Sequence, residues 1–439
     1  MRSAKVLALL IAALALLAAG CGGDDDDGDN GDGAAQEEEI SGNVSIMGVW
    51  TGEEAASFEA VLDGFAEQQP DVTVNYNPVG DEIPTVLATR VEGGNPPDVA
   101  TAPQPGLVSD FHDQGVLQSL DFAAEEIESN FTEGAYDFAT FDGEIFGFLF
   151  KAANKSTVWY NVALFEQAGV EPPETFEDFL EVAQTLRASG TQAYSIGADV
   201  GWPLTDIFEN IYLRQAGPEM YDQLADGEIP WDDQSVKDAL ETMAEIVGDT
   251  DNLVGGTSGA VQTDFPTSVQ NAFKEDPDAA MVLEGDFVGG EILASTPSQP
   301  VEDFDVFDFP SVEGSEPMVV GGGDTMIMFN DTPAAQALIR YLATPEAAEI
   351  WAERGGFSSA NRNIDTGVFP DEISERTATA LAEAEVFRFD LSDLQPAAFG
   401  ATVGQGLWQE FIEFLRNPDD VDGAAERMQQ EAERRGPGS

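Results

Sequence analysis

The chain has 439 residues, with 83 acidic against 18 basic side chains, a formal net charge of −65 at pH 7, one histidine and one cysteine. A surface this acidic repels nucleic acid and anionic lipid, which excludes both as partners. The single cysteine excludes an intramolecular disulfide, and the single histidine excludes a histidine-rich zinc site.

The first twenty residues have the pattern of an export signal. Arg2 and Lys5 precede an apolar run over residues 6–17, which is short for a membrane span but has the length of a signal-peptide core. The run ends in Leu17-Ala18-Ala19-Gly20-Cys21, which resembles a bacterial lipobox, although Ala18 stands where Leu is usual. The sequence therefore predicts a signal peptide over 1–20 and a lipid on Cys21, which would hold the protein at the outer face of the cell membrane or in the periplasm.

An acidic segment follows over residues 21–42. It consists mainly of Gly, Asp and Glu with little apolar content, and Asp24 to Asp27 form an unbroken charge run. Such a composition buries too little surface to fold, so we expect a disordered tether. The alternative, a calcium loop, is disfavoured because the turn-forming Gly and the bidentate Glu are not spaced as that loop needs. We expect no metal and no cofactor.

About 395 residues remain, more than one core of ordinary size accommodates, so two lobes are predicted. Strands are predicted over 44–50, 72–76 and 98–102. Helices are predicted between them, over 53–68, where Phe58, Val61, Leu62 and Phe65 recur at helical spacing, and over 83–91. This order indicates a parallel sheet with a ligand site at the carboxyl ends of its strands.

The rest of the chain also alternates strands and helices. Strands over 143–151 and 157–160 could cross between the lobes. Further strands are predicted over 193–197, 280–283 and 304–309, and further helices over 176–188, 233–247 and 265–273. The first of these helices would be capped by Thr175 and ended by Gly190. Gly321 to Gly323 predict a break between two strands within 318–329, and helices capped by Thr332 and Thr344 should follow.

No catalytic set is apparent. A Ser-His-Asp triad would have to use His112, but the chain has no Gly-x-Ser-x-Gly elbow, and we expect this histidine on a helix surface. Gly321 to Asp324 lack the lysine of a phosphate-binding loop. Pairs of carboxylates arise by chance among 83 acidic residues. A secreted glycosidase therefore stays an alternative that no pattern favours.

Aromatic residues, by contrast, stand beside polar ones at strand ends and loop-to-helix junctions. Sugar rings have apolar faces and hydroxyl edges, and a sugar site combines aromatic platforms with carboxylates and amides. Core packing is the alternative for each of these aromatics, but it is weaker where an aromatic residue shares a turn with Asp. The aromatics in question are Trp50, Trp159, Tyr160, Trp202, Phe287 and Phe399.

The turn around Trp202 gives the sharpest expectation. Gly201 permits unusual backbone angles, and Pro203 should hold Trp202 extended rather than helical. A helix is predicted over 206–214, with Asp206 in its first turn. The indole and this carboxylate would together suit a pyranose ring.

Several segments, in their order and spacing, resemble the extracellular solute-binding proteins of carbohydrate ABC importers, particularly the alpha-glucoside-binding branch. The resemblance runs from about Val44 to Arg434. It is carried by residues 93–99 (GGNPPDV), 103–106 (PQPG), 158–161 (VWYN), 201–206 (GWPLTD), 281–287 (MVLEGDF), 321–324 (GGGD) and 354–358 (RGGFS).

The resemblance implies a type II periplasmic-binding-protein-like α/β fold, in which two lobes of mixed sheets flanked by helices enclose a ligand cleft and close by hinge motion. Lobe 1 would comprise 43–152 plus about 315–357, and lobe 2 would comprise 153–314 plus about 358–435. It implies a monomer without catalysis that binds a sugar and delivers it to ABC permease subunits. A binder of polyamine, metal, peptide or phosphate remains the other rival. The acidic surface is typical of proteins from saline habitats.

The resemblance also implies which residues bind the ligand. Loops of the first lobe would supply Trp50 and Gln104, and Tyr160 would be the tyrosine that follows the crossover. Trp202 and Asp206 would stack on the sugar ring and bind a hydroxyl, respectively. The remaining expected contacts are Asp286 and Phe287 in one turn, the polar Asp324 and Arg354, and the late aromatic Phe399.

Overall fold

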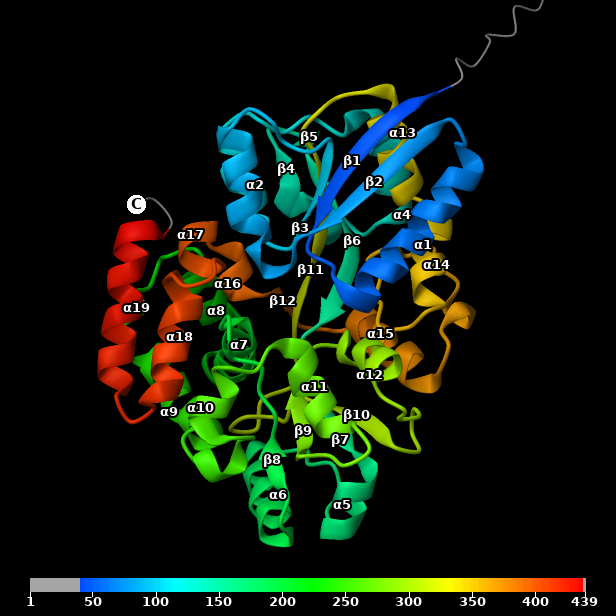
Figure 1. Cartoon of the computed structure of the whole chain (residues 1–439). Coiled ribbons are helices and arrows are strands. Elements are labelled where there is room, and N and C mark those ends of the chain that lie inside the picture. Colours follow the sequence, from blue (N-terminus) through cyan, green and yellow to red (C-terminus); the bar gives the residue numbers. More distant parts are fainter. Residues whose placement is uncertain (1–39, 437–439) are drawn as a thin grey trace, which may run out of the picture. The chain divides into compact units, whose positions relative to one another are not determined.

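Two separate β-sheets organise residues 40–436, the part of the chain that the computed structural model describes (Figure 1). The predicted signal peptide, Cys21 and nearly all of the predicted acidic tether lie outside these residues. The predicted α/β character, with mixed sheets flanked by helices, is confirmed.

The first sheet has six strands in the order β12-β11-β3-β1-β2, and β6 also pairs with β11. β1 is parallel to β2 and to β3, as the strand-helix-strand pattern predicts. β11 is antiparallel to β3 and β6, so the sheet is mixed. Its strands are β1 (Gly42–Gly48), β2 (Val72–Pro78), β3 (Val99–Ala102), β6 (Gly147–Asn154), β11 (Val319–Met328) and β12 (Phe387–Phe389).

The second sheet has four strands in the order β10-β7-β9-β8, and β8 and β9 are its parallel pair. Its strands are β7 (Thr157–Asn161), β8 (Gln192–Tyr194), β9 (Ala279–Leu283) and β10 (Phe304–Asp308). A two-stranded hairpin of β4 (Thr140–Phe141) and β5 (Glu144–Ile145) stands apart from both sheets.

Helices flank both sheets. Those packed around the first sheet are α1 (Gly52–Gln68), α2 (Ile83–Glu92), α3 (Pro105–Asp113), α4 (Ala124–Asn130), α13 (Pro333–Leu342) and α14 (Pro345–Ala352). Those packed around the second are α5 (Val162–Ala168), α6 (Phe176–Ser189), α7 (Trp202–Ala216), α8 (Pro218–Ala225), α9 (Gln234–Val247), α10 (Gly256–Ala260), α11 (Phe265–Phe273) and α12 (Val288–Ser295).

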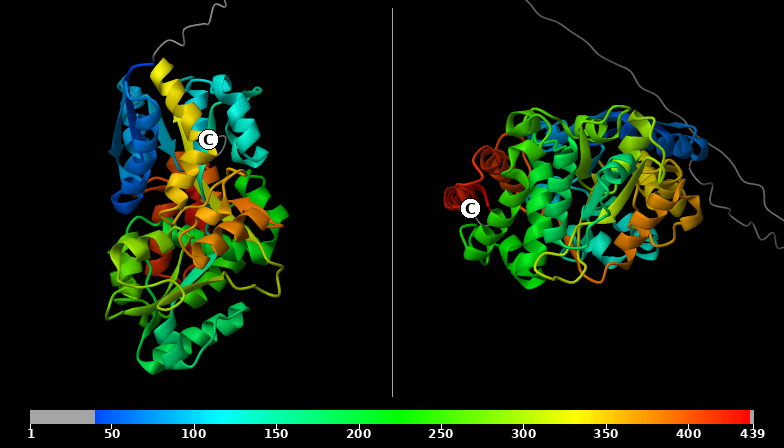
Figure 2. Two further views of the ribbon diagram at one scale, coloured as in Figure 1. Left: turned by 90° about the vertical axis from the view of Figure 1, so that its right-hand side faces the viewer. Right: turned by 90° about the horizontal axis from the view of Figure 1, so that it is seen from below.

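The C-terminal helices belong with the second lobe. They are α16 (Leu391–Leu394), α17 (Ala397–Gly400), α18 (Gly406–Arg416) and α19 (Val421–Arg435). α18 contacts α7 and α19 contacts α9, and Figure 2 shows this red pair beside the green helices. α15 (Glu372–Glu383) precedes β12 and inserts Ile373 into the core under the second sheet.

Each sheet carries a hydrophobic core on both faces. In β1, Val44 and Ile46 enter one core and Met47 enters the other, and in β7 Val158 and Trp159 divide in the same way. Successive strand side chains point to opposite faces, so a sheet covered by helices on both sides reads as a continuous apolar run. This explains why the strands were recognisable in the sequence.

The chain passes between the two sheets several times. β6 runs into β7 through Lys155 and Ser156, residues 309–318 lead from β10 to β11, and the chain crosses again after α14. The segments are bonded together: the Lys155 N–H donates to the Val320 carbonyl at 2.9 Å, and the Ala152 N–H donates to the Ser358 carbonyl at 2.8 Å. The exact lobe limits given above remain a prediction.

The predicted break at Gly321 to Gly323 is wrong, because β11 passes through these glycines as one strand with a register shift only between Asp324 and Thr325. A Cβ on Gly321 would stand 2.1 Å from the Phe387 ring, and one on Gly323 would stand 2.4 Å from the Lys151 carbonyl. The glycines therefore allow close packing of neighbouring strands and do not end the strand.

Candidate ligand-binding site

A cavity of about 660 Å³ opens between the lobes, which is the size of a small-molecule site. Its first-lobe wall includes Trp50, which follows β1, and Gln104, which follows β3. Both stand at carboxyl ends of parallel strands, where the sequence pattern placed a ligand site. The second lobe contributes residues from the starts of α7 and α11, from α12 and from the C-terminal helices.

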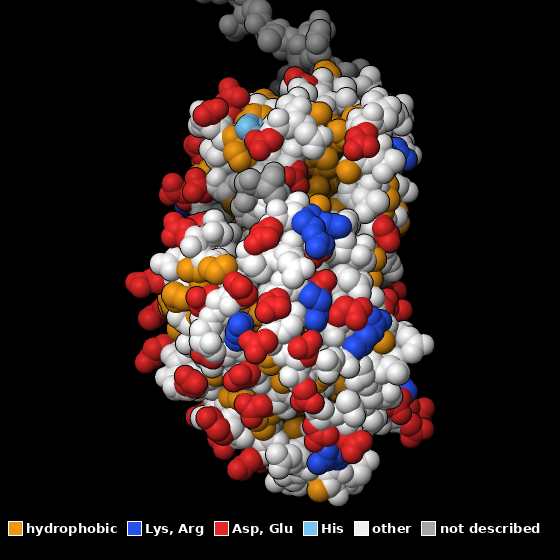
Figure 3. All heavy atoms as spheres, turned by 90° about the vertical axis from the view of Figure 1, so that its left-hand side faces the viewer, with side chains coloured by type: hydrophobic (Ala, Val, Ile, Leu, Met, Phe, Trp, Pro, Cys, Tyr) orange, Lys and Arg blue, Asp and Glu red, His pale blue; other side chains and the backbone are white. Residues whose placement is uncertain are grey.

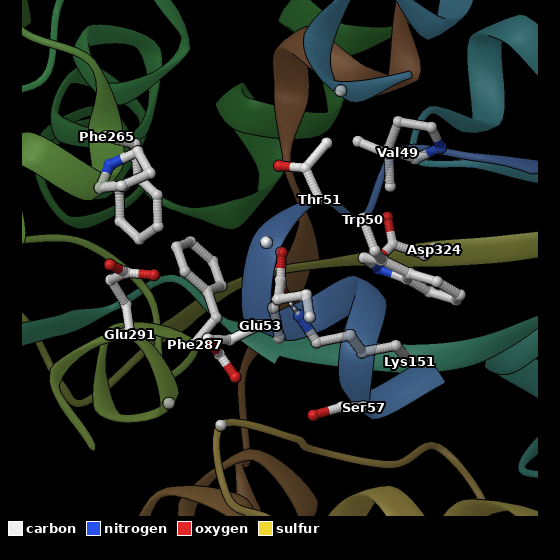
Figure 4. A pocket seen from close by; sticks show the side chains of 18 of the residues that line it. Val49, Trp50, Thr51, Glu53, Ser57, Lys151, Phe265, Phe287, Glu291 and Asp324 are labelled. Atoms are coloured by element: carbon white, nitrogen blue, oxygen red, sulfur yellow. Dashed lines mark hydrogen bonds and ion pairs between the residues drawn. The ribbon is translucent and has the colours of Figure 1, made fainter. Parts of the chain in front are cut away.

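The second-lobe wall is aromatic. The ring centroids of Trp202 and Phe265 are 5.4 Å apart, those of Phe265 and Phe287 are 5.3 Å apart, and those of Trp202 and Phe287 are 6.0 Å apart. All three side chains are half-buried. Figure 4 shows Phe265 and Phe287 together on one side of the cavity, with the Glu291 carboxylate beside them. The wall therefore offers apolar ring faces next to a hydrogen-bond acceptor.

Trp202 reaches this wall in a different way from the one predicted. It is the first residue of α7, so the predicted extended conformation and the predicted helix start at Asp206 are wrong. Pro203 is tolerated in the first turn because the N–H it lacks has no partner within a helix. Gly201 adopts a positive φ of 104°, as expected, and a Cβ there would stand 2.3 Å from the Trp408 carbonyl.

Lys151 interacts with two carboxylates of the first-lobe wall, Glu54 and Asp324. It projects from β6, is 4% exposed, and its Nζ lies 2.5 Å from Glu54 Oε1. Burial opposes the charged form of Lys151, but Glu54 and Asp324 outweigh it and raise its pKa above the ordinary value. Burial raises the pKa of Asp324 to about 6, against the effect of Lys151. Trp50 Nε1 donates to this carboxylate at 2.7 Å, so donors and acceptors alternate along the wall (Figure 4).

Lys155 forms a second charged group at the cavity floor. Its Nζ contacts Asp206 Oδ1 at 3.1 Å, Asp390 Oδ2 at hydrogen-bond distance and Asp393 Oδ2 at 3.7 Å. Burial raises the pKa of Asp206 to about 7. Burial alone would raise the pKa of Asp390, but Lys155 together with the hydrogen bonds to this carboxylate lowers it to about 2. Asp206 is 2% exposed, so it holds Lys155 from behind the wall.

Among residues 40–436, one group of carboxylates is close enough to hold a metal ion: Asp206, Glu209 and Asp390. Two of the three already bind the Lys155 ammonium. Glu209 accepts hydrogen bonds from the backbone N–H groups of Leu391 and Ser392, both at 2.9 Å. An ammonium and helix-terminal N–H groups thus take the positions that a cation would take, and these residues do not fit a metal centre.

Comparison with known proteins identifies the kind of site. Residues 50–349 match the family described as bacterial extracellular solute-binding protein. The chain belongs to this family. The osmoprotective compounds-binding protein GgtB of Synechocystis sp. is 34% identical over 383 residues, covering 86% of this chain and 89% of the relative. The alpha-glucosides-binding periplasmic protein AglE of Rhizobium meliloti is 30% identical over 402 residues, covering 87% and 85%.

Solved structures give the fold. The bacterial solute receptor AcbH has a TM-score of 0.78 at 18% identity and covers 90% of this chain and 99% of its own. Maltose-bound MalE3 of T. maritima has a TM-score of 0.72 at 18% identity and covers 89% and 99%. The predicted type II, two-lobed fold is confirmed. The chain is a solute-binding protein and not an enzyme. Within residues 40–436, no helix has the length and apolar character needed to cross a bilayer.

Six of the ten predicted contact residues of this solute-binding protein are brought together at the cavity. They are Trp50, Gln104, Trp202, Phe287, Asp324 and Arg354. Arg354 is exposed and donates from Nε to Ser57 Oγ at 2.9 Å. Their contact with a ligand stays a prediction, and it agrees with the finding that all six line the same cavity.

The other four do not line the cavity. Asp206 and Asp286 are buried behind its wall. Tyr160 projects from β7 onto Phe165 and Phe307, with ring centroids 4.5 and 5.8 Å away. Phe399 is fully buried against Trp231 in the second-lobe core. The structure therefore does not support Tyr160 or Phe399 as sugar contacts, because their rings are used in packing.

Neither cavity lysine was predicted from the sequence, and of their partners Glu54, Asp390 and Asp393 were not predicted either. A signal was present: the chain has only five lysines, and Lys151 and Lys155 stand four residues apart within and just after an otherwise apolar strand. A lysine in a buried strand needs a carboxylate partner, so this spacing marks a site. Phe265 was also missed, although Asp264 beside it caps α11, because its segment looked like an ordinary helix start.

Proposed function

We propose that this solute-binding protein is the sugar-capturing component of an ABC importer and that its ligand is an alpha-glucoside or another small oligosaccharide. One observation carries the proposal: the cavity sets an aromatic wall against a wall of alternating lysine, carboxylate and indole N–H groups. Apolar ring faces and hydroxyl edges are what a pyranose presents to such walls. The protein would act as a monomer. Closure of its lobes around the sugar would form the complex that the permease recognises.

The names of related proteins support this ligand class. One relative is named for osmoprotective compounds and another for alpha-glucosides. Proteins of the same fold include a receptor described as preferring β-D-galactopyranose, a raffinose complex and a maltose complex.

A thermal-shift screen tests the proposal. The panel is glucose, galactose, maltose, trehalose, sucrose and raffinose, with glutamate, phosphate and spermidine as non-sugar controls. A ligand present at about 100 times its Kd adds about 2.7 kcal/mol to the free energy of unfolding, so the binding sugar should raise the Tm clearly. A shift with a non-sugar control alone would overturn the proposal. Release of glucose from maltose during incubation would favour the glycosidase instead.

We further propose that Cys21 becomes the acylated N-terminus and anchors the protein to the membrane. The export signal and the Ala-Ala-Gly-Cys junction support this. Cys21→Ala should release the protein from the membrane fraction or leave its signal uncleaved, as judged by fractionation and the size of the chain. A variant that matures and still sediments with membranes would show that the anchor lies elsewhere.

A further inference from the structure

Asp286 lies where the second lobe meets two of the crossing segments. Its Oδ2 accepts hydrogen bonds from the Asn154 N–H at 3.1 Å and from the Ser358 hydroxyl, and its own N–H donates to the Asn154 carbonyl at 2.9 Å. Asn154 ends β6, and Ser358 follows α14. One carboxylate, 4% exposed, thus ties the end of β9 to the segments that join the sheets.

The next residue is part of the cavity wall. Phe287 faces the cavity, and α12, which follows it, lines the same wall with Gly290, Glu291 and Leu293 (Figure 4). The Phe287 ring lies so close to Gly285 that a Cβ there would stand 2.4 Å from it. The ring therefore packs against the backbone of its own turn, directly beside Asp286.

We infer that Asp286 is a positioning residue, which couples ligand contact at Phe287 to closure of the lobes by pinning the aromatic wall to the crossing segments. The inference rests on the proposed function as a closing solute binder. Without the carboxylate, the Asn154 N–H and the Ser358 O–H are left buried with no acceptor, and of these bonds only the one from the Asp286 N–H to the Asn154 carbonyl still joins the wall to the crossing segments.

Substitutions can separate this role from a general structural one. Asp286→Asn keeps a carbonyl oxygen for the same two donors, and Asp286→Ala removes it. Ser358→Ala removes one donor only. Asp233 offers a matched control: its Oδ1 accepts from the Ser235 N–H at 2.9 Å and the Ser235 hydroxyl at 2.7 Å, at the start of α9 and away from the cavity.

Two readouts apply. In sugar-free protein, hydrogen exchange is followed at the Lys155 amide, which bonds Val320 and not Asp286. Calorimetry and small-angle scattering with maltose and trehalose then report affinity and closure. We expect Asp286→Ala to speed that exchange about tenfold and to weaken disaccharide binding about tenfold, the equivalent of losing about 1.4 kcal/mol. Ser358→Ala should do the same to a smaller extent, while Asp286→Asn and Asp233→Ala should resemble the parent protein.

Two results would overturn the inference. If Asp286→Asn speeds the exchange and weakens disaccharide binding as much as Asp286→Ala does, the negative charge of Asp286 and not its hydrogen bonds accounts for the effects. If Asp233→Ala has the same effects, loss of stability explains them. Should the parent protein bind neither these disaccharides nor any other sugar of the panel, the proposed function fails, and the sugar-free exchange measurement still decides whether Asp286 holds the crossing segments.

Discussion

Trp202 presents a half-buried indole to the cavity from the first position of α7. One side of the ring packs near Phe265 and Phe287, and Lys155 Nζ lies 5.8 Å from its centroid. These neighbours hold the indole in place at the cavity wall. Trp202 does not belong to the hydrophobic cores of residues 40–436. This is the position from which a sugar ring could be stacked.

Trp202→Ala should weaken sugar binding by about 1–3 kcal/mol, the scale of losing one stacked aromatic contact and its buried area. The sugar-free Tm should change little because the side chain is a cavity wall. Calorimetry with the sugar selected by the thermal-shift screen, alongside a sugar-free melt, measures both quantities.

Trp231 provides the control for this substitution. It is 3% exposed and packs on Phe399 in the second-lobe core. Trp231→Ala should cost about 3–5 kcal/mol of stability through the cavity it leaves, while the protein that stays folded keeps its affinity. A Trp202 variant that behaves in this way, with lower Tm and intact affinity, would contradict a binding role.

Single residues were predictable where a local pattern reveals them and not where their partners are distant. Trp202 stood out through its Gly and Pro neighbours. The partner of Asp206, in contrast, is Lys155, which lies 51 positions earlier. No local sequence pattern around either residue predicts this pair. Tyr160 and Phe399 were expected at the ligand because the family resemblance implies it, but only the packing of the lobes determines which way each ring points.

At the scale of elements, local signals again carried the correct predictions. The hydroxyls of Thr175, Thr332 and Thr344 each accept from the backbone N–H three residues on, so all three predicted caps are confirmed. The glycines of β11 failed as a predictor because the same residue serves as a chain breaker and as a site of close strand contact. Only the neighbouring Phe387 and Lys151 reveal the second use.

The start of α7 depends on Gly201. Its φ of 104° is unfavourable for other residues, and an added Cβ would meet the Trp408 backbone. Gly201→Ala should therefore destabilise the protein by more than about 1 kcal/mol and also weaken sugar binding, because Trp202 follows directly. Urea denaturation and calorimetry would measure the two effects.

Gly217→Ala separates strain from clash. Gly217 ends the same helix with a φ of 84°, but no atom lies within 4 Å of its added Cβ. This variant should lose stability through backbone strain alone and keep its affinity. Equal losses of affinity in both variants would mean that α7 as a whole, and not the placement of Trp202, controls binding.

For the whole molecule, buried carboxyls near the cavity set the response to acid. Burial raises the pKa of Asp206 to about 7 and those of Asp286 and Asp324 to about 6. Their unfolded values lie near 3.9, so the folded state binds protons more tightly. The stability they contribute is complete below about pH 4 and is lost as the pH rises through 6 to 7.

The free energy of unfolding should therefore be higher near pH 5 than near pH 8, in urea titrations at constant ionic strength. The lowered pKa of Asp390, about 2, acts in the opposite direction but only in stronger acid. Asp324→Asn should reduce the slope, and the same substitution at the exposed Asp226 serves as control. A stability that rises from pH 5 to pH 8 would contradict this account.

The surface charge acts over the whole chain. Removing the predicted leader with Arg2 and Lys5 takes the formal charge from −65 to −67. Figure 3 shows acidic side chains spread over one face of the protein, with few basic ones between them. Most ion pairs in residues 40–436 involve exposed groups, and such pairs contribute little, so they do not offset the repulsion.

Folding should accordingly depend on salt. Like charges on the compact state repel one another, and unfolding relieves that repulsion by moving them apart. Between roughly 10 mM and 1 M salt the Debye length falls from about 30 to about 3 Å, so screening should raise the Tm progressively. Thermal melts of the sugar-free chain in NaCl, with sucrose-free buffer and constant pH, measure this. Repeating them near pH 4, where many carboxylates are protonated, should flatten the dependence. A Tm that does not change with salt at pH 7 would show that repulsion between these charges does not limit the stability of the fold.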